Sequence, residues 1–145
     1  MTQSWTPARV FMLVASAVHV PLGIIGLLVN QAFPVGASAA ARADSHHVFG
    51  IFMTNGWHSL AALGLGIVMA YYAVYPRRAR EAALLIGLMH VGIVVAFAVW
   101  DPSTFWFASN GADQIIHAST AIGGIGSALL TRTAGSRVAA PARGV

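Results

Sequence analysis

Residues 110–117, Asn110-Gly111-Ala112-Asp113-Gln114-Ile115-Ile116-His117, begin the last of four long apolar segments in this 145-residue chain. They place a carboxylate and an imidazole four residues apart, close to the point where a helix would enter a membrane. On a helix this spacing brings both side chains to one face. Asp113 is therefore predicted to hold His117 in one orientation and one tautomer.

The composition is typical of a protein that is surrounded by lipid. Hydrophobic residues make up 57% of the chain and charged residues only 8%, whereas a soluble domain has about 25% charged residues. The eight basic residues are all arginines, and long apolar runs separate them, so they cannot form the basic face of a nucleic-acid-binding protein. The absence of cysteine excludes disulfides, thiolate metal sites, iron–sulfur clusters and covalently attached c-type haem.

Four transmembrane helices are expected, because a helix needs about 20 apolar residues to cross a bilayer. The predicted spans are residues 8–30, 49–75, 81–100 and 112–131. The first is longer than the apolar core of a cleaved signal peptide, so it is predicted to remain in the protein. We expect a single all-α domain, an antiparallel four-helix bundle in the membrane, followed by a disordered cytoplasmic tail at residues 132–145.

The arginines predict the orientation of the bundle. Seven of the eight lie near the N-terminus, in the second loop or in the tail: Arg9, Arg77, Arg78, Arg80, Arg132, Arg137 and Arg143. The first and third loops together carry one arginine and two aspartates. Because basic residues favour the cytoplasmic side, both termini and the second loop are predicted to be cytoplasmic.

Polar residues gather at the predicted outer ends of the second and fourth spans. Asn55 precedes His58 in one span, and Asn110 precedes Asp113 and His117 in the other. Polar side chains within spans usually face the bundle interior, where a partner satisfies them. One interpretation is structural, with these residues serving as helix caps and interhelical hydrogen-bond partners.

A second interpretation makes the same residues a metal- or proton-responsive site on the extracytoplasmic side. His58, Asp113 and His117 would form it, with help from His46 or His47 in the preceding loop. Zinc or copper would suit imidazole and carboxylate ligands, with Asp113 orienting His117.

His19 and His90 lie near the middle of the first and third spans, so every span carries one histidine. A b-type haem needs two imidazoles at one depth on different helices. Two such pairs can be drawn, His19 with His90 and His58 with His117. Alternatively, each histidine bonds a backbone carbonyl or a hydroxyl, and the glycines of the spans serve close helix packing instead of making room for a porphyrin.

Two stretches resemble the motifs of a bacterial membrane family known as domain of unknown function 4383. They are residues 49–58, Phe-Gly-Ile-Phe-Met-Thr-Asn-Gly-Trp-His, and residues 109–117 at the start of the fourth span. The resemblance covers about residues 8–132. The family's second-span motif is Asn-x-x-His-Asn-x-x-His, of which this chain keeps Asn55 and His58 but has Ser59 and Ala62 at the last two positions. Gln114 replaces the asparagine of the fourth-span motif, Ala-Asp-Asn-x-x-His. The resemblance implies a four-span fold in a bacterial plasma membrane and no particular activity.

We therefore expect a small, non-enzymatic membrane protein without a cofactor, whose polar network is mainly structural. Its expected partners are the lipid bilayer and either another membrane protein or a second copy of the chain, and not nucleic acid. The alternatives are the metal- or proton-responsive site and an electron carrier that holds haem b or acts on a quinone. The last would resemble the four-helix DoxX-type proteins.

Overall fold

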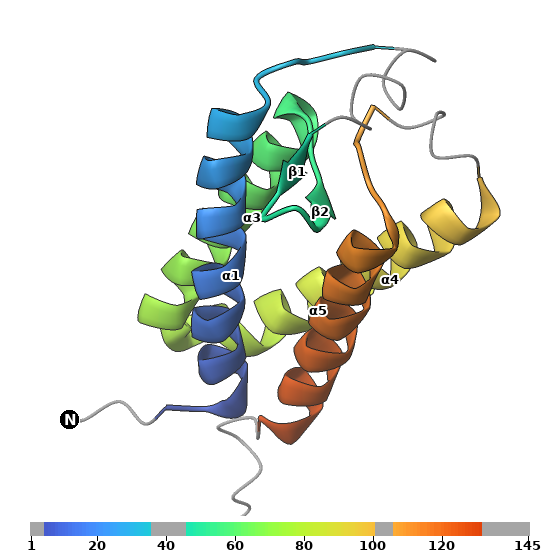
Figure 1. Ribbon diagram of the computed structural model, residues 1–145. Helices are drawn as coiled ribbons and strands as arrows, with labels where there is room; N and C mark the ends of the chain where they lie inside the picture. Colours follow the sequence, from blue (N-terminus) through green and yellow to red (C-terminus); the bar gives the residue numbers. More distant parts are fainter. Residues whose placement is uncertain (1–4, 36–45, 101–105, 132–145) are drawn as a thin grey trace, which may run out of the picture.

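The computed structural model describes residues 5–35, 46–100 and 106–131. Within these ranges the chain forms four long α-helices and a short β-hairpin (Figure 1). The elements are α1 (Pro7–Val29), β1 (His47–Val48), β2 (Phe52–Met53), α3 (Gly56–Val74), the 3₁₀ turn η1 (Pro76–Arg78), α4 (Ala79–Val99) and α5 (Gly111–Leu130). The predicted helical class is confirmed. The predicted tail, residues 132–145, lies outside the described residues.

Three helices, α1, α3 and α4, are long and apolar enough to cross a membrane. The fourth, α5, has 20 residues but is not among the three, because its first two turns carry Asp113, Gln114 and His117. On all four helices large apolar side chains point outward, among them Leu28, Leu60, Leu85 and Ile122. Exposing such an apolar surface to water would cost free energy, whereas exposing it to lipid would not.

The helices pack as two pairs, α1 with α3 and α4 with α5 (Figure 1). Glycines hold each pair together at close range. A Cβ atom on Gly23 of α1 would lie 2.5 Å from the backbone nitrogen of Leu63, and one on Gly124 of α5 would lie 2.7 Å from the carbonyl oxygen of Ala83. Only glycine permits backbones to approach so closely, as in other membrane helix pairs.

Arginines connect the helices of both pairs in the same way, at the end of each pair that lies away from the hairpin. Nε of Arg9 donates to the carbonyl oxygen of Ala73 at 3.0 Å, and Nε of Arg80 donates to that of Ala128 at 3.0 Å. Each acceptor lies in the last turn of a helix, where carbonyls lack intrahelical partners and the helix dipole favours a cation. These arginines therefore stabilise the fold, whatever their effect on orientation.

The segment before α3 differs from the prediction that a span begins at residue 49. Strands β1 and β2 pair antiparallel, with His47 opposite Met53. Phe49 and Gly50 between them have φ of 54° and 70°, and the N–H of Ile51 donates to the carbonyl of Val48 at 3.1 Å. These are the features of a tight hairpin turn. Periodicity did not reveal it, because a short apolar run is compatible with a strand or a helix.

Candidate functional site

At the hairpin end of the molecule, two asparagines connect the start of α3 and the start of α5 by a reciprocal pair of hydrogen bonds. Asn55 caps α3, accepting from the backbone N–H of His58 at 2.9 Å, and its amide donates to the carbonyl of Trp106 at 2.7 Å. Asn110 caps α5 and donates to the carbonyl of Ile51 at 2.8 Å. Each helix cap is therefore bonded to the segment that leads into the other helix.

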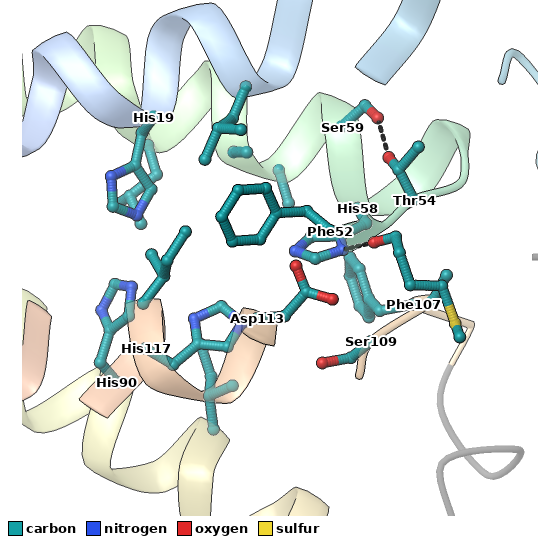
Figure 2. Close-up of a pocket in the computed structure, with 18 of the residues that line it drawn as sticks. His19, Phe52, Thr54, His58, Ser59, His90, Phe107, Ser109, Asp113 and His117 are labelled. Atoms are coloured by element: carbon teal, nitrogen blue, oxygen red, sulfur yellow. Dashed lines mark hydrogen bonds between the residues drawn. The ribbon is translucent and has the colours of Figure 1, made fainter. Parts of the chain in front are cut away.

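Asp113 lies in the first turn of α5 and is almost completely buried. Its Oδ2 accepts from the backbone N–H of Asn110 at 2.9 Å, which completes a capping box, and the N–H of Met53 also donates to the carboxylate. The carboxylate interacts electrostatically with His58 and lies beside it (Figure 2). Among the described residues, Nδ1 of His117 is buried without a hydrogen-bond partner, so Asp113 does not hold that nitrogen as predicted. The carboxylate instead accepts a backbone N–H as part of the capping box of α5.

Four histidines, one from each long helix, form a row across the interior. The ring centres of His19 and His90 are 5.8 Å apart, those of His90 and His117 are 5.4 Å apart, and those of His117 and His58 are 5.9 Å apart. We call these four residues the histidine row. His46 and His47 belong to the hairpin region and do not line the space that the row faces.

Backbone carbonyls fix the tautomer of three of the imidazoles. Nδ1 of His19 lies 2.8 Å from the carbonyl oxygen of Ala15, and Nδ1 of His90 lies 2.8 Å from the carbonyl oxygen of Ile86. Nδ1 of His58 lies 3.2 Å from the carbonyl of Met53. A carbonyl can only accept, so Nδ1 carries the hydrogen in each ring, and Nε2 of the neutral ring presents a lone pair.

Two buried nitrogens of the row have no hydrogen-bond partner in the described part of the chain. They are Nε2 of His19 and Nδ1 of His117, both buried. Buried polar atoms in folded proteins nearly always have a hydrogen-bond partner, because an unsatisfied one costs about 1–3 kcal/mol. These two atoms therefore mark a place where a ligand would stabilise the protein.

A cavity of about 570 Å³ adjoins the row. The four histidines and Asp113 are among its polar lining residues, and the rest of its wall is predominantly apolar. Figure 2 shows these side chains around the cavity together with Phe52 from the hairpin and Phe107 from the segment before α5. The volume lies within the range of about 300–1,000 Å³ of small-molecule sites, which share this mostly apolar character.

The predicted metal site has no ligand set in the described part of the chain. Within residues 5–35, 46–100 and 106–131, no group of three or more histidine, cysteine, aspartate or glutamate side chains is placed to hold an ion. His58 and His117 stack with an angle of 29° between their planes. Their ring centres are 5.9 Å apart, and the described residues place no third ligand beside them.

Several residues of the site carried no signal in the sequence. Leu22, Leu65 and Ile93 line the cavity but look like ordinary membrane-span residues. Phe52 lies in a strand that was predicted as helix. The detectable signal was one histidine in each span, at two depths, and the structure brings all four together.

Comparison with known proteins identifies the family of the chain. Residues 9–130 match the family described as Domain of unknown function (DUF4383), which confirms the resemblance of the two motifs. No curated protein and no solved structure matches the chain.

Proposed function

Because this chain belongs to the DUF4383 family, whose description states no activity, we propose its function from the geometry of the cavity. The protein is a four-span membrane protein that binds a lipid-soluble small molecule between its helices. It acts as a binding protein and not as an enzyme. The observation that carries this proposal is a mostly apolar cavity of about 570 Å³ lined by four histidines, two of which have a buried ring nitrogen without a hydrogen-bond partner in the described part of the chain.

The two properties of the cavity define its ligand. An empty apolar space of this size would forgo many dispersion contacts, and water would find few partners on a wall that is mostly apolar. The nitrogen lone pairs of His19 and His90 require a group that donates a hydrogen or accepts an electron pair. The ligand is therefore mainly apolar, with either a hydroxyl-type donor or a metal centre.

The ligand reaches the cavity from the lipid, between α3 and α4. These helices follow each other in the chain but contact each other much less than the members of either glycine-packed pair. Val68 of α3 and Met89 of α4 line the cavity and are 44% and 42% exposed on the outer surface. The close-packing glycines of these two helices point elsewhere, Gly66 toward α1 and Gly87 toward α5.

We propose that α5 is the fourth helix that crosses the membrane. Its length of 20 residues corresponds to about 30 Å, the thickness of the hydrocarbon core. Its outer face carries four large apolar side chains that are 69–74% exposed: Ile115, Ile122, Leu129 and Leu130. Such a face belongs in lipid, whereas Asp113, Thr120 and Ser127 of α5 are buried. With Arg9 and Arg80 at one end of the bundle, the positive-inside rule predicts that both termini are in the cytoplasm of a cell whose plasma membrane holds the protein.

The polar network then divides into two parts with different roles. Asn55, Asn110 and Asp113 make capping and cross-linking hydrogen bonds, which supports a structural role. The histidine row faces the cavity, which supports a ligand-binding role. We therefore keep the structural role predicted from the sequence for the capping residues, and we propose ligand binding in its place for the histidines.

Mass spectrometry of the bound small molecule tests the proposal. The full chain is purified in mild detergent from its native membrane, and the organic extract is quantified against protein. Ala62→Phe places a large ring on the cavity wall, and Ala98→Phe makes the same change on an exposed position of α4. We expect one molecule for each chain in the wild type and in Ala98→Phe, and little in Ala62→Phe. A wild type without a stoichiometric ligand, or equal occupancy in both variants, would contradict the proposal.

A further inference from the structure

We infer that the ligand is a b-type haem whose iron is bound by His19 and His90. This inference rests on the proposed function, since it names the molecule that occupies the cavity. Of the two histidine pairs that the sequence allowed, the structure favours this one by the partners of the Nδ1 atoms and by the depth of the rings.

The two rings stand where axial ligands of one metal would stand. They come from different helix pairs, their centres are 5.8 Å apart and their planes are at 88°. Two imidazoles that bind one metal through bonds of about 2 Å each have ring centres about 6 Å apart. The rings point toward one another (Figure 2), yet Nε2 of His19 has no hydrogen-bond partner in the described part of the chain, so no direct bond joins them.

The Nδ1 atoms of this pair are held as those of metal-bound histidines usually are. Such histidines donate their second ring N–H to a carbonyl or carboxylate, which fixes the tautomer and directs the ring. His19 and His90 do so identically, each to the carbonyl four residues earlier, at 2.8 Å. The other pair does not, because Nδ1 of His117 has no hydrogen-bond partner in the described part of the chain.

A repeated arrangement places both histidines at one depth. Each lies ten residues after an arginine, at positions 9 and 19 in α1 and at positions 80 and 90 in α4. Ala8 at the start of α1 donates its N–H to the hydroxyl of Thr131, and Arg80 at the start of α4 donates to Ala128, so both helices start beside the end of α5. Ten residues of helix rise about 15 Å, which is half of a hydrocarbon core of about 30 Å. The metal site is therefore in the middle of the membrane.

The cavity beside the pair suits a porphyrin. Apolar side chains from three helices line it next to the two imidazoles, among them Leu22, Leu65 and Ile93. Haem needs only two protein ligands, so the absence of a three-ligand group in the described residues agrees with it. Imidazoles on both faces leave the iron no open position for a substrate. The bound haem would therefore transfer electrons and would not activate oxygen.

Visible spectroscopy with added hemin tests the assignment. The full chain is expressed with a haem precursor, purified in mild detergent and titrated with hemin, so that haem lost during preparation is restored. We expect one haem for each chain, with a low-spin spectrum when oxidised and sharp visible bands after reduction. His19→Ala and His90→Ala should lose that spectrum, whereas His46→Ala, outside the cavity, should keep it.

A fourth variant separates ligand loss from misfolding. His90→Met replaces one imidazole by a thioether, which can still bind haem iron and raises its reduction potential. We expect this variant to retain haem with a changed spectrum and a higher potential. Unchanged low-spin spectra in His19→Ala and His90→Ala would overturn the assignment. A folded wild type that takes up no hemin but carries another apolar molecule would overturn the haem and leave the proposed function intact. A wild type with neither would overturn both.

Discussion

Replacing Asn55 should cost more stability than replacing Asn110, although both cap a helix and both donate to the opposite segment. Loss of an asparagine cap costs about 1 kcal/mol, and Asn55→Ala and Asn110→Ala share this loss. Asn55 is completely buried, and its bond to the carbonyl of Trp106 is 2.7 Å long in a partly buried place. Leaving that carbonyl unsatisfied adds about 1–2 kcal/mol, from the lower part of the range for buried groups.

The corresponding bond of Asn110 to Ile51 is exposed, so water can replace the lost donor at little cost. We therefore expect a loss in unfolding free energy of about 2–3 kcal/mol for Asn55→Ala and about 1 kcal/mol for Asn110→Ala. Glycine substitutions isolate the cross-link, because glycine at a cap costs only a few tenths of a kcal/mol. Asn55→Gly should still lose about 1–2 kcal/mol, whereas Asn110→Gly should be nearly neutral.

The assay is unfolding by sodium dodecyl sulfate in mixed micelles, followed by circular dichroism, on all four variants and the wild type. Helix content before unfolding shows whether each variant starts folded. Equal losses for the two alanine variants, or a neutral Asn55→Gly, would refute the reasoning. Either result would mean that the bond to Trp106 contributes no stability beyond that of the cap.

Two further predictions concern packing and orientation. Gly124→Val should destabilise the protein by about 1–3 kcal/mol, because its Cβ would meet the backbone of Ala83. Gly126 has open space around it, so Gly126→Val should change the unfolding free energy little. Equal effects of the two substitutions would disprove the packing of α4 on α5. Since the chain has no cysteine, a membrane-impermeant maleimide should label Ile51→Cys on intact cells and Arg77→Cys only after permeabilisation, and the reverse pattern would invert the proposed topology.

The histidine row shows how two similar helix pairs can produce a single site. In each pair an arginine and a histidine ten residues apart lie on the first helix, and an asparagine caps the second. The first helices bring His19 and His90 together, and the second helices add His58 and His117 nearer the hairpin. The contacts between α3 and α4 are sparse, which leaves room for the cavity on that side.

Local features of the sequence were sufficient for the helical class. Apolar length predicts helices that can cross a membrane, and the capping residues act on backbone atoms within three positions, as Asn110 and Asp113 do. The depth of a residue also follows from the sequence, because each helical residue adds a constant rise. For this reason the positions of His19 and His90 in the chain are sufficient to suggest that the two histidines pair at one depth.

Only the tertiary structure decided which way each side chain faces. Rotation of a helix about its axis changes no local hydrogen bond, so the sequence left open whether the four histidines would meet. The close contacts of Gly23 and Gly124 with neighbouring helices determine that rotation. The hairpin at residues 47–53 places the N–H of Met53 where it donates to Asp113. The cavity is likewise a property of the assembly, because it lies between helices that are apolar on several faces. Packing of distant segments, which no local pattern encodes, therefore made the site.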